Sequence, residues 1–283
     1  MTWSRATRSK PCPACGKPDW CGHTADGAIR CMRTDEPPPG YRLVKSDEHG
    51  GNVFIAGEGN EWRPKPKAAP KPQPTIDWTS AQQQFVDDLD DELEEELAGH
   101  IGVGQPWTML FGIGWSHSHK AWTFPMRDHM TRIVGIRLRT REGRKLAIKG
   151  SKEGIFSPEI KGMKTDEVLI GEGPTDAMHL WNLGFIAIGR PSCTGAADIC
   201  KRFVGTRAAV IVSDRDSPGR KGAATLADKL AGQCASVKVI EPLQGKDARD
   251  WIEGGATAEQ IRIVIDSAME HGDETKQVSG STR

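Results

Sequence analysis

Short apolar runs alternate with stretches of helical spacing through the second half of the chain. The runs are rich in β-branched residues and cover 168–171, 185–188, 208–213 and 237–240. The spacing between and after them predicts helices at 174–183, 196–203, 222–231 and 258–269. Runs this short, separated by helical segments, are typical of strands buried in a parallel sheet. The pattern therefore predicts βαβ units with right-handed crossovers and an α/β fold.

The first half of the chain predicts a different architecture. A helix is expected from Thr79-Ser80 to about residue 97, with one apolar face. That face is formed by Phe85, Leu89, Leu93 and Leu97. The other face carries eight acidic residues between 87 and 96, which we interpret as a solvated surface, with contact to the basic segment downstream as the alternative. Strand-like runs at 121–124, 132–139 and 145–148 predict a mixed α+β region.

Composition narrows the class of protein only slightly. The 283 residues have a formal net charge of zero, so bulk charge points to no partner, and the length suits one large domain or two to three small ones. No apolar run approaches the roughly 18 residues that a membrane span needs, and the N-terminus lacks the apolar core of a signal peptide. We therefore expect a cytoplasmic protein, without contact to a membrane.

Four of the seven cysteines lie between residues 12 and 31. They are Cys12, Cys15, Cys21 and Cys31. A Cys-x-x-Cys pair followed by two further thiols supplies the four ligands of a structural Zn²⁺ site, although His23 can take the place of Cys21 and unligated thiols are the alternative. Arginine and lysine residues surround the cluster, which fits contact with nucleic-acid phosphates. Trp20 can stack on a base or belong to a core.

A basic segment lies between residues 120 and 164, where twelve basic residues face four acidic ones, an excess of eight positive charges. Arg137, Arg139 and Arg141 alternate along one predicted strand, so they share a face. We interpret this face as a groove for phosphates of a nucleic acid or a nucleotide, with a solvated face as the alternative. After the strand at 185–188, Arg190 is a further candidate phosphate contact.

Carboxylates follow three of the strands predicted in the second half. Glu172 follows the first run, Asp214 and Asp216 follow the third, and Asp247 follows the fourth after a short loop. Asp176 lies in the first turn of the helix after Glu172 and can face the same cavity. Ligands gather at the carboxyl ends of parallel strands, and clustered carboxylates are hard to keep ionised without a cation. The pattern predicts a Mg²⁺ site and metal-assisted phosphoryl transfer.

These motifs resemble those of bacterial and phage DNA primases. Residues 166–265 resemble a Toprim domain through Glu172-Gly173, Asp214-Arg-Asp216 and Lys246-Asp247, which follow in the family's order. Residues 12–33 resemble the zinc-binding module of primases, and residues 110–157 the basic subdomain of phage helicase–primases. The implied domains are a zinc-ribbon-like module at 1–48, a Pro/Lys-rich linker at 49–76, a mixed α+β basic subdomain at 77–164, an α/β Toprim domain at 165–270 and a disordered tail at 271–283.

The resemblance also implies roles for individual residues. Asp214 and Asp216 would be metal ligands, Glu172 a ligand or general acid/base, and Asp176 and Asp247 further members of the catalytic cluster. The substrate-binding residues would be Arg137, Arg139, Lys149 and Lys246. The implied activity is synthesis of short RNA primers on single-stranded DNA from nucleoside triphosphates, with catalytic Mg²⁺ or Mn²⁺, structural Zn²⁺, a separate helicase partner and a phage or mobile-element origin in a bacterial host cell.

The chain departs from the family pattern in three places. Two of the cysteines are separate rather than in a second Cys-x-x-Cys pair, and the last motif reads Lys-Asp-Ala-Arg-Asp where the family often has Lys-Asp-Pro-Asp. A nucleotide-binding loop of the Gly-x-x-x-x-Gly-Lys-Ser/Thr type is missing, so helicase activity is not expected within this sequence. A Toprim nuclease and a non-catalytic DNA-binding replication factor remain alternatives. Topoisomerase is disfavoured, because the single tyrosine is Tyr41, beside the cysteines.

Overall fold

The computed structural model of the protein describes residues 2–46, 50–57, 76–159 and 165–272. The chain divides into two units, Met1–Pro72 and Gln73–Arg283, and each is described by itself. Most of the predicted linker, at 58–75, and nearly all of the predicted tail, at 273–283, lie outside the described residues. The same holds for the end of the basic segment, at 160–164.

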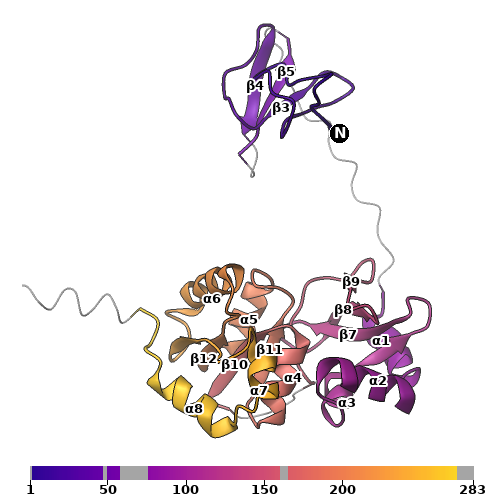
Figure 1. The fold of residues 1–283 in the computed structure, drawn as a ribbon, viewed down its shortest axis with the longest axis vertical. Coiled ribbons are helices and arrows are strands. Elements are labelled where there is room, and N and C mark those ends of the chain that lie inside the picture. The colour runs from indigo at the N-terminus through magenta and orange to yellow at the C-terminus, as the bar shows by residue number, and fades with distance from the viewer. Residues whose placement is uncertain (1, 47–49, 58–75, 160–164, 273–283) are drawn as a thin grey trace, which may run out of the picture. The chain divides into compact units, whose positions relative to one another are not determined.

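The N-terminal unit is a small antiparallel sheet built on the cysteine cluster (Figure 1). Its strands are β1 (Ser4–Arg5), β2 (Gly22–His23), β3 (Ile29–Cys31), β4 (Tyr41–Ser46) and β5 (Asn52–Ala56), in the order β1-β2-β3-β5-β4. Strand β5 lies beyond residue 48, where the sequence placed the end of this module. It pairs with both β3 and β4 and buries Val53 and Phe54, so the unit extends into the stretch assigned to the linker.

The C-terminal unit begins with a mixed α/β part, residues 76–159, which we call the mixed lobe. It contains α1 (Trp78–Asp87), α2 (Asp91–Ile101), α3 (Trp107–Phe111), β6 (Gly114–Ser116), β7 (Ala121–Arg127), β8 (Ile133–Thr140) and β9 (Lys145–Ala147). The four strands form an antiparallel sheet in the order β6-β7-β8-β9. Ile136 and Leu138 of β8 pack with Phe85 of α1 on one face of this sheet.

The single helix predicted from residue 80 to 97 is instead two helices, so that prediction was wrong. Asp90, one of the acidic residues, accepts a hydrogen bond from the backbone N–H of Leu93 and begins α2. Asp77 does the same for α1 through the N–H groups of Thr79 and Ser80. An aspartate with extended backbone is a favoured N-cap residue. Asp90 therefore starts a new helix, although the apolar spacing alone predicts one continuous helix.

Residues 165–272, the parallel lobe, form a four-stranded parallel sheet with helices on both faces (Figure 1). The strands are β10 (Glu167–Glu172), β11 (Ala187–Arg190), β12 (Ala208–Val212) and β13 (Val237–Ile240). The helices are α4 (Pro174–Asn182), α5 (Ala197–Val204), α6 (Ser217–Leu230), α7 (Ala248–Glu253) and α8 (Ala258–Ser267). The α/β architecture predicted from the apolar runs is confirmed.

The strand order is β11-β10-β12-β13, so the chain leaves β10 toward one side and later returns to its other side. The topological switch point therefore lies between β10 and β12, where ligands bind in open parallel sheets. Alternate residues of β10 enter different cores: Val168 and Ile170 pack against α5 and α6, whereas Leu169 joins the core of α4, α7 and α8. Side chains pointing to opposite faces of a strand produce this division.

Helix α6 starts earlier than predicted, and helix α7 was not predicted at all. Helix α6 begins at Ser217 rather than at residue 222, because Asp216 caps it and Pro218 lies in its first turn. The short helix α7 was not predicted and begins after Asp247, whose side chain accepts the N–H of Asp250. Both new helix starts therefore use carboxylates that the sequence assigned to the candidate site.

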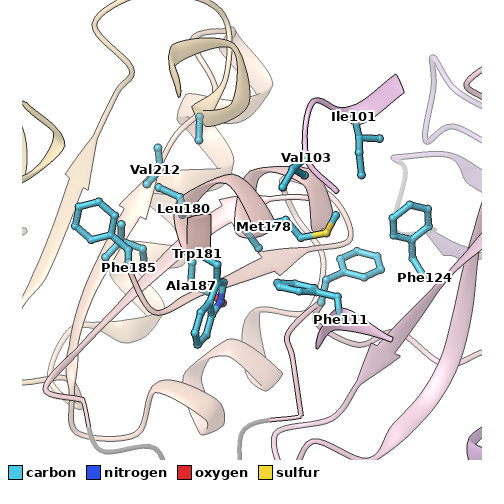
Figure 2. Close-up of a cluster of buried hydrophobic side chains, with 14 of the residues drawn as sticks. Ile101, Val103, Phe111, Phe124, Met178, Leu180, Trp181, Phe185, Ala187 and Val212 are labelled. Atoms are coloured by element: carbon cyan, nitrogen blue, oxygen red, sulfur yellow. The ribbon is translucent and has the colours of Figure 1, made fainter. Parts of the chain in front are cut away.

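The two lobes share one hydrophobic core (Figure 2). Ile101, Phe111 and Phe124 of the mixed lobe and Met178 and Trp181 of α4 are all buried in it. A pair of backbone hydrogen bonds, each 2.8 Å long, also joins Phe156 to Gly189 at the end of β11. Burial of so many large side chains between the lobes sets their relative position. Within the described ranges, no helix has the length and apolar character that crossing a bilayer requires.

Candidate functional site

The five predicted carboxylates lie at the carboxyl end of the parallel sheet. Glu172 ends β10, and Asp214 follows β12 by two residues, so they flank the switch point. Asp176 lies in the first turn of α4, and Asp216 and Asp247 are the N-caps of α6 and α7. The three helix starts thus hold three of the carboxylates against the ends of the two central strands.

Asp176 is the most buried of these carboxylates, with 3% of its surface exposed. One of its oxygens accepts the backbone N–H of Glu172 at 3.1 Å, and the other accepts that of Arg249 at 3.3 Å. Burial raises its pKa well above the ordinary value, and the charges of Asp247 and Asp214 raise it further. Asp176 therefore joins the loop after β10 to the start of α7 and keeps both in place.

Asp214 shows the crowding of negative charge most directly. Burial, followed by the charges of Glu172 and Asp247, raises its pKa to about 6, although Lys246 acts to lower it. The amine Nζ of Lys246 lies 3.8 Å from Asp214 and 3.5 Å from Asp216, measured to one Oδ of each. The pKa of Asp216 is lowered instead, chiefly because its carboxylate accepts the N–H of Gly219 at 2.8 Å.

The donor set fits a hard divalent cation. Carboxylate oxygens suit Mg²⁺, and a cation would relieve the repulsion that raises the pKa of Asp214. A Cβ on Gly219 would come within 2.6 Å of the Cβ of Asp214, so only glycine lets α6 start this close to the carboxylate. Among the described residues, the four cysteines alone form a group of three or more His, Cys, Asp or Glu side chains placed to hold a metal ion, so the carboxylates do not form such a group as they stand.

Arg190, a candidate phosphate contact, has a different role. Its side chain is buried and donates to the backbone carbonyls of Gly195 at 3.1 Å, Cys193 at 2.5 Å and Gly222 at 3.4 Å. These bonds tie the loop after β11 to helix α6. The guanidinium therefore makes its hydrogen bonds within the protein and stabilises the loop next to the candidate site.

The basic strand β8 turns its arginines toward the covered face of the antiparallel sheet. Arg137 lies opposite Phe124 and Arg139 opposite Trp122, and residues paired in this way share a face. Both aromatic residues belong to the core shared by the two lobes. Arg139 is half-buried, and its pKa is lowered by burial and then by the charge of Arg249, on the parallel lobe. The charge of Arg139 therefore acts on the same region as that of Arg249, on α7.

Arg141, the residue after the end of β8, differs from Arg137 and Arg139. It makes two hydrogen bonds of 2.7 Å to Glu96 of α2, and its guanidinium lies 4.8 Å from the centre of the Trp115 ring. The contact between the acidic helix and the basic segment, which the sequence left as an alternative, is therefore present. Arg141 holds α2 against the sheet.

Two predicted lysines and one missed arginine complete the surroundings. Lys149 lies in an exposed turn after β9, whereas Lys246 lies beside Asp214 and Asp216. Arg249 was not predicted, although a basic residue inside the acidic motif Lys-Asp-Ala-Arg-Asp was a visible signal. Its backbone already takes part in the site through Asp176.

The N-terminal unit gathers the sulfurs of its four cysteines within 4.8 Å of one another. The cluster consists of Cys12, Cys15, Cys21 and Cys31, and His23 is not part of it. Burial acts to raise the pKa of Cys15, but the N–H of Lys17 and the neighbouring thiols lower it to about 7. Four thiols at this separation, one of them readily ionised, fit a tetrahedral Zn²⁺ site.

Next to this cluster, Trp20 is 77% exposed and has a left-handed backbone with φ of 62°. The guanidinium of Arg33 lies 5.8 Å from the centre of its ring and is held by two bonds to Asp19, of 2.8 Å and 2.6 Å. A bulky residue rarely adopts this conformation, and a core role for Trp20 is inconsistent with its exposure. The ring offers a free aromatic face beside a positive charge.

Comparison with solved structures shows that the fold is similar to that of primase domains. No family model and no curated protein matches the sequence. A DNA primase domain from Pseudomonas aeruginosa is 16% identical, with a TM-score of 0.57 over 71% of this chain and 81% of that chain. The zinc-binding and RNA polymerase domains of Aquifex aeolicus primase are 17% identical, with a TM-score of 0.56 over 70% and 62%.

A phage structure is similar as well. A chain from the bacteriophage T7 complex, in which primase domains of two gp4 subunits are bound to an RNA/DNA hybrid and dTTP, is 18% identical. Its TM-score is 0.50, over 61% of this chain and 91% of that chain. At these identities the shared property is the fold. The fold is that of a primase catalytic core, as the resemblance of the motifs implied.

Proposed function

We propose that the protein is a DNA primase, which synthesises short RNA primers on single-stranded DNA by metal-dependent nucleotidyl transfer. The observation that carries this proposal is the position of Glu172 and Asp214 on the two strands that flank the switch point of a primase-like fold. We assign the parallel lobe to the Toprim class on the same grounds. A phage or mobile-element origin and a separate helicase partner follow only from the resemblance of the sequence.

In this proposal Glu172, Asp214 and Asp216 hold Mg²⁺ or Mn²⁺, which would neutralise triphosphate charge and activate the attacking 3′-oxygen. Asp176 positions the backbone of Glu172 and of Arg249, and its burial keeps this arrangement rigid. Burial and neighbouring carboxylates raise the pKa of Asp214 to about 6, and a bound cation would lower it by offsetting this negative charge. Lys246, whose Nζ lies 3.8 Å from Asp214 and 3.5 Å from Asp216, would contact a phosphate held beside these carboxylates.

The N-terminal unit would engage the template. Zn²⁺ on the four cysteines would hold its small sheet together, because its core contains few side chains besides the cysteines themselves. Eight basic and four acidic residues lie between positions 1 and 46, a balance that favours contact with phosphates. The exposed ring of Trp20 would stack on an unpaired base, with Arg33 beside it. One structural neighbour, a DnaG catalytic domain, was solved bound to single-stranded DNA.

Primer synthesis is the direct test. The purified protein is incubated with Mg²⁺, labelled nucleoside triphosphates and a mixed-sequence single-stranded DNA, and the products are resolved on a denaturing gel. We expect short template-dependent oligonucleotides from the parent and none from Asp214→Ala, with unchanged circular dichroism. An Asp214→Ala protein as active as the parent contradicts the proposal. Cleavage of the DNA without incorporation would assign the site to a nuclease instead.

A further inference from the structure

A buried histidine on α4 faces a carboxylate on α7. His179, in the last turn of α4, has 2% of its surface exposed. Its Nδ1 lies 2.9 Å from the backbone carbonyl of Thr175, which accepts hydrogen bonds but cannot donate them, so Nδ1 carries a proton. The other ring nitrogen, Nε2, is buried without a hydrogen-bond partner among the described residues, and Oε1 of Glu253 lies 3.4 Å from it. In the neutral ring, two acceptors therefore face each other.

The mixed lobe closes over this contact. Glu253 is the last residue of α7, and Gly102 is the C-cap of α2, with φ of 74°. A Cβ on Gly102 would collide with the carboxylate of Glu253 and lie 3.2 Å from Nε2 of His179, so glycine is needed there both for its backbone and for the space. A proton on Nε2 would place a positive charge between Glu253 and the partly negative C-terminal end of α2.

Glu253 is the ionisable side chain that the structure places at Nε2 of His179. The elements packed on α4 are α3, α7, β10 and β11, and α3 contains no ionisable side chain. On α7, Nε of Arg249 lies 4.0 Å from the other oxygen of Glu253. The remaining charged groups on these elements, on α4 itself and in the last turn of α2 either have other partners or lie toward the opposite end of α4; they are Glu167, Glu172, Asp176, Arg190, Asp250 and His100.

Both ends of α7 thus meet α4. At its start, the backbone N–H of Arg249 is bonded to Asp176 at 3.3 Å, and at its end Glu253 meets His179. Asp247 caps α7, and its charge raises the pKa of both Asp176 and the carboxylate of Asp214. Because α7 has only six residues, a shift at Glu253 moves Asp247 as well. The contact at His179 is therefore linked to the geometry of the carboxylate cluster.

We propose that His179 is a positioning residue controlled by its own protonation: the imidazolium ion donates a hydrogen bond from Nε2 to Glu253 and fixes α7, with Asp247, against α4. When Nε2 loses its proton the bond is lost, and the last turn of α7 is released from α4. The effect on catalysis rests on the proposed function, whereas the hold on α7 does not. Asp176 acts with the opposite sign, because its carboxylate ionises as pH rises and then accepts the N–H of Arg249 more strongly.

Hydrogen exchange of the α7 amides in the full-length protein tests this hold. It is measured by mass spectrometry and corrected for the intrinsic effect of pH, at about pH 5.5 and 8.5, on either side of the range in which imidazoles titrate. His179→Asn keeps an N–H near the place of Nδ1 and has no atom at that of Nε2. Its α7 amides should exchange about 5- to 20-fold faster than those of the parent at the lower pH, from loss of one charged hydrogen bond, and within about twofold at the higher pH.

Glu253→Gln gives a second and sharper expectation. Its amide N–H can donate to the neutral ring, so its α7 amides should exchange about 2- to 5-fold more slowly than those of the parent at the higher pH and faster at the lower pH. The matched control is His271→Asn, which breaks a contact of 2.7 Å between another histidine and Asp228, at the amino end of β13. It should leave α7 exchange within about twofold of the parent at both pH values.

The outcomes separate this role from packing and from the proposed function. Exchange in His179→Asn that equals the parent at the lower pH overturns the proposal, and so does an equal excess at both pH values, which would give the ring a packing role. The same order of Glu253→Gln and parent at both pH values also overturns it. A pH-dependent hold on α7 in a protein without primer synthesis would uphold the positioning role and reject the primase function.

If the parent makes primers, the pH profile tests the effect on catalysis. Synthesis by Glu253→Gln relative to the parent should rise by about 3- to 10-fold from the lower to the higher pH, because only the parent loses the contact that aligns Asp247. Asp214 titrates in both proteins, so its contribution cancels in this ratio. A constant ratio overturns the effect on catalysis. Thermal melting of each variant confirms that it is folded.

Discussion

Asp214 should destabilise the metal-free protein at neutral pH, so its removal should stabilise it. Its side chain is 12% exposed, and its pKa is raised from 3.8 to about 6. A shift of about two units corresponds to about 3 kcal/mol at most between the ionised and neutral forms. Asn cannot ionise and retains the shape of the carboxyl group. We therefore expect Asp214→Asn to raise the free energy of unfolding by about 2 to 3 kcal/mol at pH 8.

The pH dependence gives the sign of this effect. Because the folded-state pKa lies above the unfolded value, the native protein binds more protons than the unfolded chain between pH 4 and about 6. The stability of the parent should fall as pH rises through this window, and the difference between variant and parent should grow with it. Asp176 contributes in the same direction in both proteins, and because the charge of Asp214 also raises the pKa of Asp176, its change in the variant adds to the difference with the same sign.

Denaturant titrations of parent and Asp214→Asn at pH values from 4 to 8, without divalent metal, measure the effect. The midpoint of thermal unfolding of the roughly 200-residue C-terminal unit should differ by about 5 to 10 °C at pH 8. Asp216→Asn is the matched control, because the pKa of Asp216 is lowered in the folded state and the sign should reverse. Adding Mg²⁺ should stabilise the parent more than Asp214→Asn. Equal stability of variant and parent at pH 8, or a difference independent of pH, would refute the reasoning.

Other substitutions test the remaining parts of the structure. Cys31→Ser should abolish stoichiometric Zn²⁺, measured by atomic absorption, since four sulfurs are needed to close a tetrahedral site. Gly219→Ala should reduce primer synthesis at least about tenfold, because its Cβ would lie 2.6 Å from that of Asp214 and displace it; unchanged activity would contradict that contact. Trp20→Ala should weaken binding of single-stranded DNA by about 5- to 100-fold, from the value of one base stack, with Zn²⁺ content unchanged.

The parallel sheet could be predicted from the sequence because its strands are buried on both faces. Such strands are continuous apolar runs, and the residues after them lie at one edge of the sheet whatever the loops do. Glu172 and Asp214 were located in this way without knowledge of any contact. The break between α1 and α2 could not be predicted from the sequence, because Asp90 is one of eight acidic residues in this stretch. Only its extended backbone shows that it is the N-cap of α2.

Two arginines show where prediction from the sequence ends. Arg190 follows a strand as a phosphate ligand would, but its acceptors are carbonyls of Gly195 and Gly222, the second of them 32 residues away. The charge of Arg249 lowers the pKa of Arg139, which lies on β8 more than 100 residues earlier in the chain. Partners so distant along the chain are brought together by the shared core, and local patterns do not encode them.

The unsatisfied charges on the two lobes have opposite signs. On the parallel lobe, the carboxylates crowd until the pKa of Asp214 rises to about 6, with Lys246 as a single nearby amine. On the mixed lobe, the buried Nε of Arg137 has no hydrogen-bond partner, and burial together with the charge of Arg249 lowers the pKa of Arg139. A cation alone would relieve the first repulsion and leave the second, and an anion alone would do the reverse. A nucleoside triphosphate together with its divalent cation would supply both charges in adjacent positions, as the proposed metal-dependent nucleotidyl transfer requires.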